Sequence, residues 1–369
     1  MINMPLTAGI VGLPNVGKST LFNAITRSQV EAANYPFATI KPNVKTVEVP
    51  DGRVDKLSAM FNPRKTIRTV FEFTDIAGLV KGASKGEGLG NQFLGHIRTV
   101  DAICHVVRCF DDNNIMHVEN TVDPRRDIEI VNVELQLADL ETVTNRIGKI
   151  ERKAQSRKKD AVKEFELLKR LKQALLSGQS VRSVEVNVDE AELLKNYQLL
   201  TEKPVIYIAN MSEAEVGDPE QSAYYREVRK IAEAEGNKVI AIAARTEEEL
   251  SQMDDEDRQM LLEEMGLERS GLDEIIMTAY ATLNLCTFFT VGTDEVRAWT
   301  FTKGMKAPDC AGVIHTDFKK GFIRAEVYTY DDIMTYGNEV ALKEAGKLRI
   351  EGKEYVVQDG DIMHIRFNV

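Results

Sequence analysis

The chain has 369 residues, of which 43% are hydrophobic and 28% charged, a composition typical of a globular protein that is too long for one ordinary core. The formal net charge of −11 argues against a protein that coats itself with nucleic acid. No apolar run is long enough to span a bilayer, no secretory signal pattern is present, and the four cysteines are scattered, so we expect a monomeric cytoplasmic protein without membrane contact.

The first predicted strand and helix flank a phosphate-binding motif. An apolar run at 6–11 leads into Gly12-Leu13-Pro14-Asn15-Val16-Gly17-Lys18-Ser19-Thr20, and a helical pattern follows at 19–25. In GxxxxGK[ST], backbone N–H groups turn inward around the α- and β-phosphates, the lysine reaches the β- and γ-phosphates, and the serine hydroxyl binds Mg²⁺. We therefore predict a nucleoside triphosphatase in which Lys18 is also catalytic and Ser19 also binds the metal. The predicted nucleotide contacts here are Asn15, Val16, Gly17, Lys18, Ser19 and Thr20.

Two later loops have the features of nucleotide-dependent switches. Thr39 lies between the first helix and the second strand, where a threonine can close over Mg²⁺. A β-branched and aromatic strand at 67–73 leads to Asp75-Ile76-Ala77-Gly78. We expect Asp75 to hold Mg²⁺ through water and Gly78 to offer its N–H group to the γ-phosphate. Four glycines between 81 and 90 indicate a mobile segment.

The catalytic group is less clear from the sequence. Ras-like enzymes place a glutamine after this motif to orient the attacking water, but Leu79 stands there and cannot bond to water. Hydrolysis is therefore slow or relies on another group. His117, which follows the predicted strand at 102–109, is the candidate, because histidine is the common acid–base catalyst near neutral pH; a surface or packing histidine is the alternative. Lys18, Mg²⁺ and a K⁺ ion held by Asn15 would then supply the positive charge that stabilises the transition state.

A helical segment then interrupts the alternation of strands and helices. Apolar residues recur at intervals of three and four over 133–154 and again over 162–175, separated by a polar break. This pattern predicts two amphipathic helices packed as an antiparallel hairpin inserted into the nucleotide domain. Residues 146–172 carry eleven basic and four acidic side chains, a local charge of +7 near the tip. A solvated helical face is the simplest interpretation of such a run.

The residues expected to read the base follow a strand at 205–209. Guanine-specific G domains carry NKxD there, whereas this chain has Asn210-Met211-Ser212-Glu213. Glu213 is one methylene longer than the aspartate that binds guanine, and Met211 is neutral and polarizable. Asn210 could bond to the N6/N7 edge of adenine, as asparagine does in DNA readout. After a strand at 239–243, Ala243 and Ala244 would offer N–H groups to the base, so we predict ATP over GTP.

The last part of the chain changes character near residue 284. Short apolar segments and turn residues such as Asp359-Gly360-Asp361 predict a small, mostly β domain. Its predicted strands are 287–291, 296–300, 312–314, 325–328, 354–357 and 363–367.

Taken together, these motifs resemble the YchF subgroup of the Obg family of P-loop NTPases, the Obg-like ATPases, over the full length of the chain. The segments that carry the resemblance are 12–20, Asn34-Tyr35-Pro36-Phe37-Ala38-Thr39-Ile40-Lys41-Pro42-Asn43, 75–90, 210–213, Arg297-Ala298-Trp299 and Gly321-Phe322-Ile323-Arg324-Ala325. The resemblance implies an α/β P-loop G domain, an inserted coiled-coil hairpin and a C-terminal TGS domain of ubiquitin-like β-grasp fold. It also implies ATP preference, Mg²⁺ and association with ribosomes.

These expectations divide the chain into a G domain at 1–128 and 200–283, a hairpin at 129–199 and a TGS domain at 284–369. We expect a slow ATPase switch whose candidate ribosomal RNA surface is the basic tip at 157–159 with Lys319, Lys320 and Arg324. A GTP-hydrolysing switch of the same fold is an alternative, as is an adaptor that uses its nucleotide structurally. A metabolic kinase is weaker, because DxxG with NxxE indicates a switch.

Overall fold

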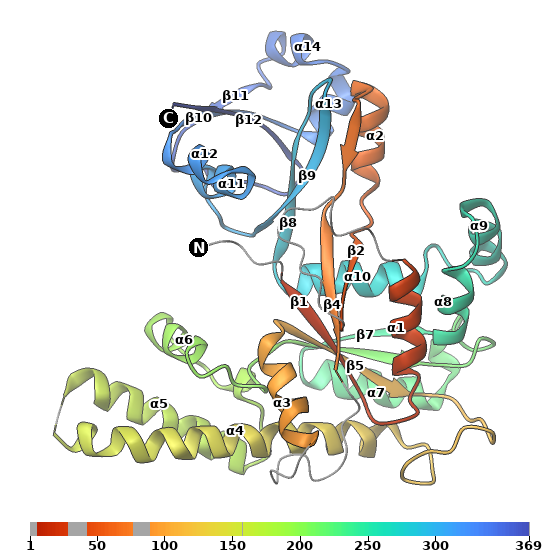
Figure 1. Cartoon of the computed structure of the whole chain (residues 1–369), viewed down its shortest axis with the longest axis vertical. Helices are drawn as coiled ribbons and strands as arrows, with labels where there is room; N and C mark the ends of the chain where they lie inside the picture. Colours follow the sequence, from red (N-terminus) through yellow and green to blue (C-terminus); the bar gives the residue numbers. More distant parts are fainter. Residues whose placement is uncertain (1–5, 29–42, 77–88, 157, 369) are drawn as a thin grey trace.

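Two six-stranded sheets organise the part of the chain that the computed structural model describes, residues 6–28, 43–76, 89–156 and 158–368 (Figure 1). The first sheet has the order β2-β4-β1-β5-β6-β7, in which β2 is antiparallel to β4 and all other neighbours are parallel. Its strands are β1 (Thr7–Val11), β2 (Val44–Glu48), β4 (Val70–Asp75), β5 (Ala102–Arg108), β6 (Val205–Asn210) and β7 (Lys238–Ile242).

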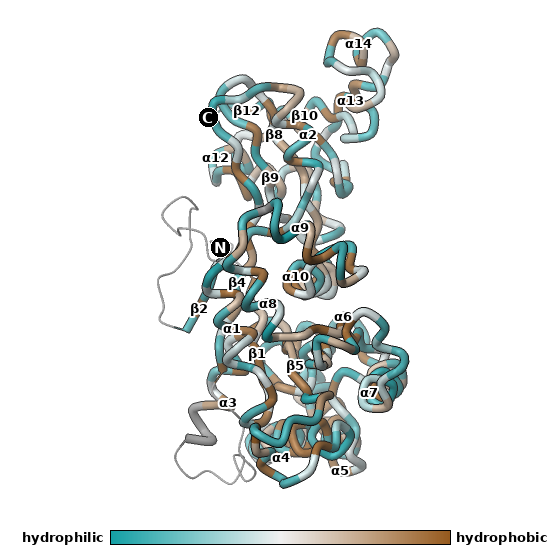
Figure 2. Tube along the Cα trace, turned by 90° about the vertical axis from the view of Figure 1, so that its right-hand side faces the viewer, coloured by the Kyte–Doolittle hydropathy of each residue, from teal (hydrophilic) through white to brown (hydrophobic). Residues whose placement is uncertain are grey.

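The main core surrounds this first sheet. Every residue of β5 and β6 is buried, as expected for central strands of a parallel sheet covered on both faces. In Figure 2, brown hydrophobic residues lie along β1 and β5. The helices that contribute most to this core are α1 (Lys18–Arg27), α3 (Leu89–Thr99), the first half of α4 (Pro124–Gln155), α7 (Ala223–Ala234) and α10 (Gly271–Thr282). The P-loop, Asp75, Asn210 and Ala243 all follow or end strands at one edge, where parallel sheets bind ligands.

The predicted helical hairpin is present as α4 (Pro124–Gln155) and α5 (Lys159–Leu176), which lie side by side (Figure 1). Asp123 begins α4 by accepting a hydrogen bond from the Arg126 N–H, and Pro124 occupies the first turn, where its missing N–H costs nothing. The two helices share a separate hydrophobic cluster that includes Val143, Leu168 and Leu171. The short α6 (Val188–Lys195) and the 3₁₀ turn η3 (Val181–Ser183) then lead back to β6.

The second sheet forms the C-terminal part, with the order β11-β10-β12-β8-β9-β3. Its C-terminal strands are β8 (Leu285–Thr290), β9 (Glu295–Thr302), β10 (Phe322–Thr329), β11 (Arg349–Glu351) and β12 (Asp361–Phe367). Four of the six predicted strands are therefore confirmed. The prediction was wrong at 312–314, which lies in the helix α11 (Ala307–Ile314), and at 354–357, where Val356 makes only an isolated bridge with Lys306.

One N-terminal segment belongs to this second sheet. The predicted strand at 67–73 is in fact two strands: β3 (Lys65–Ile67) pairs with β9, and β4 returns to the first sheet. The preceding helix α2 (Gly52–Phe61) buries Val54 and Leu57 in the cluster that contains Phe289 and Ile362. Figure 1 shows this orange helix among the blue C-terminal elements. After β2 the chain thus leaves the first sheet and contributes α2 and β3 to the C-terminal core. It then returns to the first sheet as β4, which ends at Asp75.

The remaining helical elements are short: η4 (Pro219–Gln221), α8 (Ala244–Leu250), α9 (Asp255–Glu264), α12 (Thr316–Lys320), α13 (Tyr330–Tyr336) and α14 (Glu339–Glu344). Within the described residues, none of the helices combines the length and apolar character that a membrane span requires.

Candidate nucleotide-binding site

The P-loop follows β1 and requires glycine at two positions. Gly17 has a φ of +95°, and a Cβ atom built there would lie 2.1 Å from Asn210 Nδ2, so no other residue fits without movement. A Cβ atom at Gly12 would lie 2.7 Å from the Val106 carbonyl oxygen on the neighbouring strand. Asn15 also adopts the left-handed region, with a φ of 63°, and its Nδ2 donates to the Met116 carbonyl at 3.0 Å. The loop therefore has one tightly determined shape at the N-terminus of α1.

The two charged groups expected at the phosphates are brought together. Lys18 Nζ lies 2.7 Å from Asp75 Oδ1, and their side chains are 10% and 31% exposed. Ser19 is exposed beside this pair at the start of α1. A serine hydroxyl and a carboxylate are the hard oxygen donors that Mg²⁺ prefers, and Mg²⁺ completes its shell with water and phosphate oxygens. The residues present therefore fit a metal site. Thr39, Gly78 and Leu79, the other residues predicted here, lie outside the described residues.

A cavity of about 830 Å³ opens next to the P-loop and collects most of the predicted nucleotide contacts. Those that line it are Asn15, Gly17, Lys18, Ser19, Thr20, Asn210, Met211, Glu213, Ala243 and Ala244. Val16 is only 1% exposed and packs behind the loop. The cavity has the size of a small-molecule site and unites segments that are more than 200 residues apart in the chain.

Asn210 has a structural role that the sequence did not predict. Its side chain is 4% exposed, and both polar atoms are already engaged: Nδ2 donates to the Val16 carbonyl at 2.9 Å, and Oδ1 accepts from the Ala244 N–H at 3.0 Å. Each of these two atoms keeps one further hydrogen-bonding position, so the two bonds fix the orientation of the amide, and its contact with the N6/N7 edge of a purine stays a prediction. Asn210 ties the P-loop to the loop after β7. The Ala244 N–H, which the sequence predicts to face the base, donates to Asn210 Oδ1 instead.

The sequence reasoning missed the loop after β5. Phe110, Asp111, Asp112 and Ile115 line the cavity, although only the histidine of this loop had been considered. Arg108 shapes the loop: it is 1% exposed and donates to the carbonyl oxygens of three of these residues, at 3.1 Å (Phe110), 2.9 Å (Ile115) and 3.2 Å (Asp112). The rule that ligands bind beyond the carboxyl ends of strands would have pointed to this loop.

His117 does not line the cavity. It is 4% exposed, its Nε2 lies 2.8 Å from Asp127 Oδ2, and its Nδ1 accepts the Glu119 N–H at 3.1 Å. Both ring nitrogens are therefore used inside the protein, and Asp127 is in the first turn of α4. Burial raises the pKa of Asp127, while Arg126 and His117 act in the opposite direction. This geometry supports the alternative that His117 is a packing histidine. The imidazole does not reach the cavity in which a nucleotide would bind.

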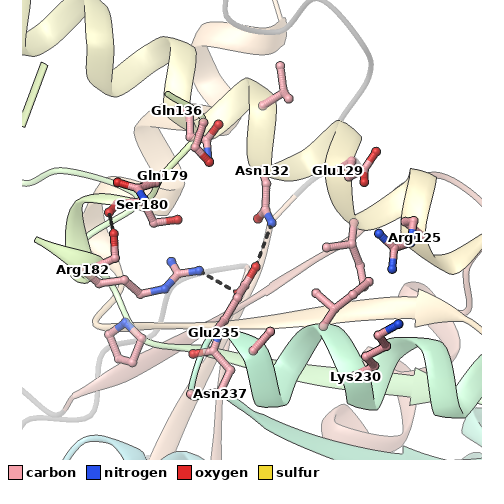
Figure 3. A pocket seen from close by; sticks show the side chains of 18 of the residues that line it. Arg125, Glu129, Asn132, Gln136, Gln179, Ser180, Arg182, Lys230, Glu235 and Asn237 are labelled. Carbon is pink, nitrogen blue, oxygen red and sulfur yellow. Dashed lines mark hydrogen bonds and ion pairs between the residues drawn. The ribbon is translucent and has the colours of Figure 1, made fainter. Parts of the chain in front are cut away.

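A second cavity, of about 840 Å³, lies at the root of the hairpin between α4, residues 178–183 and α7 (Figure 3). Figure 3 shows Glu235 at its centre. This carboxylate pairs with Arg182 at 3.1 Å and accepts hydrogen bonds from Asn132 at 3.4 Å and from the Tyr207 hydroxyl at 2.8 Å. The network joins α4 to the segment that returns from the hairpin. We therefore interpret the residues around this cavity as a brace for the hairpin, and the first cavity remains the candidate nucleotide site.

Comparisons with known proteins show to which family the chain is similar. A family model described as 50S ribosome-binding GTPase matches residues 7–146, and the model YchF-GTPase_C, described as a protein of unknown function (DUF933), matches residues 285–368. The chain is 58% identical to the ribosome-binding ATPase YchF of Bacillus subtilis and 49% identical to that of Escherichia coli O157:H7, over 99% of this chain and 100% of each relative. The solved structure of the Schizosaccharomyces pombe YchF GTPase superposes with a TM-score of 0.89 at 43% identity, covering 99% of this chain and 98% of that one.

Proposed function

Because this chain belongs to the YchF family of P-loop NTPases, we propose that it is a molecular switch that binds ATP, hydrolyses it slowly and associates with the ribosome. The observation that carries the proposal is the Lys18–Asp75 pair beside a cavity closed by the P-loop, the loop after β5 and residues 210–213. A lysine and a metal-binding carboxylate at a glycine-rich turn are the parts that phosphoryl transfer needs. Leu79, in place of the glutamine that orients water, is the reason to expect slow hydrolysis.

We propose ATP over GTP from the residues at the base end of the cavity. Met211 and Glu213 stand where guanine-specific domains carry lysine and aspartate, and both line the cavity. A pairing between a carboxylate and the guanine N1–H and N2–H₂ groups is worth about 1.5–3 kcal/mol, and the longer Glu213 is poorly placed to make it. A contact from Asn210 to the N6/N7 edge of adenine stays part of this proposal, because the amide has one donor and one acceptor position left.

The metal ions in this proposal use few protein ligands. Mg²⁺ would be held by the Ser19 hydroxyl, by Asp75 through water and by Thr39, and it would neutralise the charge that develops between the β- and γ-phosphates. K⁺ would bind the amide oxygen of Asn15, whose nitrogen is held by the Met116 carbonyl. Measuring hydrolysis in K⁺ and in Na⁺ tests the second ion separately from the first.

The ribosome contacts are proposed on the two basic surfaces. Lys158 and Lys159 are exposed at the hairpin tip, and Lys319, Lys320 and Arg324 are exposed on the C-terminal part. Neutralising both groups to glutamine should reduce co-sedimentation with ribosomes and its dependence on salt, because phosphate contacts release counterions. Lys56→Gln, an exposed change on α2, is the control. Unchanged co-sedimentation of the neutralised protein would refute these surfaces.

The domain division is proposed with two amendments. We keep the proposed boundaries at 200 and 284, whereas the one at 128 falls within α4, whose first half packs in the main core. Residues 51–67 group with the C-terminal sheet through α2 and β3. Residues 51–67 therefore connect the C-terminal sheet along the chain to both predicted metal ligands: Thr39 lies before this segment, and Asp75 lies after it at the end of β4.

Two measurements test the function as a whole. ATP and GTP should be competed against one fluorescent nucleotide analogue, and ATP hydrolysis should be measured with and without purified ribosomes. We expect preference for ATP and faster turnover with ribosomes. A clear preference for GTP would support the GTP switch of the same fold. Tight ATP binding without single-turnover hydrolysis would support the adaptor.

A further inference from the structure

A buried carboxylate outside the P-loop joins the base end of the cavity to the protein core. Glu247 lies on α8, is 4% exposed, and directs its two oxygens at the first N–H groups of α10. Oε1 accepts from the Gly271 N–H at 2.8 Å, and Oε2 accepts from the Leu272 N–H at 2.9 Å. The N-terminal N–H groups of a helix have no partner within the helix, and its dipole favours a negative charge there. Glu247 therefore clamps α8 to α10.

The other end of α8 forms the wall of the nucleotide cavity. The helix begins at Ala244, and Ala243, Ala244 and Thr246 all line the cavity. The Glu247 N–H donates to the Ala243 carbonyl at 3.0 Å, which is the first hydrogen bond of the helix. The Ala244 N–H donates to Asn210 Oδ1, so one turn of helix separates the clamp from the residue that ties this loop to the P-loop.

The helix to which Glu247 attaches α8, α10, is itself firmly packed in the main core. Ile275, Ile276 and Ala279 of α10 are 0–2% exposed in the main core. A Cβ atom at Gly271 would lie 2.6 Å from Ile242 Cγ2 and 2.9 Å from Glu247 Oε1, so the start of α10 lies against the end of β7 with no space between them. A displacement of α8 must therefore break the Glu247 bonds, since α10 cannot follow it.

We infer that Glu247 is a positioning residue for the purine-base side of this cavity, which it holds through the first turn of α8. The inference rests on the proposed function, namely that the cavity binds a nucleotide. Glu247 does not touch the ligand. It acts by keeping Ala243 and Ala244 at a fixed distance from residues 210–213, whereas the P-loop amides and Lys18 would hold the phosphates.

Glu247→Gln is the informative variant. Glutamine keeps the length of the side chain but turns one of the two acceptors into an NH₂ group that faces an N–H donor. We expect the affinity for Mg·ATP to fall about tenfold, the effect of losing one hydrogen bond to a charged group, and the affinity for Mg·tripolyphosphate to change less than twofold. Calorimetry gives both values, and the KM for ATP should rise more than kcat falls. Glu264→Gln, an exposed change on α9 away from the cavity lining, is the control and should match the parent.

The outcomes separate the possible failures. If the variant binds Mg·ATP as tightly as the parent does, or if ATP and tripolyphosphate weaken equally, the positioning role is refuted. If the parent itself binds no ATP, the proposed function fails together with this inference. If the variant does not fold, hydrogen exchange on the parent decides: ATP should increase protection of the Gly271 and Leu272 amides, and tripolyphosphate should not. Equal protection by both ligands would overturn the inference.

Discussion

Lys18 Nζ and Asp75 Oδ1 are 2.7 Å apart, so the lysine of the P-loop and the carboxylate at the end of β4 neutralise each other. In the proposed function, a triphosphate that binds Lys18 would separate this pair, and Mg²⁺ held by Asp75 through water would compensate the charge of the carboxylate. The pair would therefore link nucleotide binding to metal binding at β4, which follows α2 and β3 of the C-terminal part in the chain.

Asp75→Asn removes the negative charge that pairs with Lys18. We expect the variant to bind ATP without Mg²⁺ at least as tightly as the parent, because Lys18 is released. Mg²⁺ should increase the ATP affinity of the variant about tenfold less than it increases that of the parent, because the variant lacks one charged group near the metal. Titration calorimetry with Mg²⁺ and with EDTA measures both. Asp294→Asn, an exposed change far from the P-loop, is the control. A full magnesium effect in the variant would show that Asp75 does not serve the metal.

Gly17→Ala tests the shape of the P-loop. The added methyl group would fall 2.1 Å from Asn210 Nδ2 at a φ of +95°, so the loop and the Asn210 side chain must both move. We expect about 1–3 kcal/mol of lost stability from the strained backbone and little remaining ATP binding. Urea denaturation and nucleotide titration are the measurements. Gly52→Ala, at a helical position with nothing within 4 Å, should be neutral or stabilising. An alanine variant at 17 that binds ATP normally would contradict this account.

Asn210→Ala distinguishes a brace from a base reader. Removing the side chain frees the Val16 carbonyl and leaves the Ala244 N–H without its acceptor. A brace predicts that ATP and tripolyphosphate both bind about tenfold more weakly, because a hydrogen bond at the P-loop itself is lost. A base reader predicts that only ATP binding weakens. Binding of both ligands, with the exposed Asn196→Ala as control, decides between these outcomes.

His117→Ala and Asp127→Asn together test the remaining catalytic candidate. A histidine that acts in catalysis should lower single-turnover hydrolysis strongly when removed, with ATP affinity unchanged. A histidine that positions the loop through the 2.8 Å contact with Asp127 should give the same small loss as Asp127→Asn, with weaker ATP binding in both. We expect the second result. Hydrolysis that survives Asp127→Asn but disappears in His117→Ala would restore the catalytic role.

The buried imidazole of His105 makes stability depend on pH. It is 2% exposed on β5, and burial lowers its pKa to about 3 from 6.5. Between these values the unfolded chain binds a proton that the folded chain does not, so stability falls as the pH decreases. This ring alone should reduce the free energy of unfolding by about 2 kcal/mol between pH 7 and pH 5.

Chemical denaturation at the two pH values measures this difference. His105→Leu removes the titrating ring, so its stability should fall less than that of the parent over the same interval, whatever its stability at pH 7. His96→Gln, at an exposed position, should lose as much as the parent. The argument fails if the leucine variant and the parent have the same pH dependence.

Several features of this protein are fixed by short stretches of sequence. Gly12 to Thr20 determines the phosphate loop, because the motif needs only a strand before it and a helix after it. The hairpin of α4 and α5 follows from apolar spacing within each helix, and Asp123 and Pro124 mark its start. Such features depend on neighbours in the chain, so their pattern is visible before folding.

Other features were decided only when distant segments met. Asn210 became a brace because its amide reaches Val16, 194 positions away, and the run at 67–73 was divided between two sheets because its first residue pairs with Arg297. Val313 and Ile314 favour a strand by themselves, but they end a helix that begins after Lys306 and packs on the second sheet. Propensity and spacing are local quantities, whereas a hydrogen-bond partner or a packing surface is supplied by the rest of the fold.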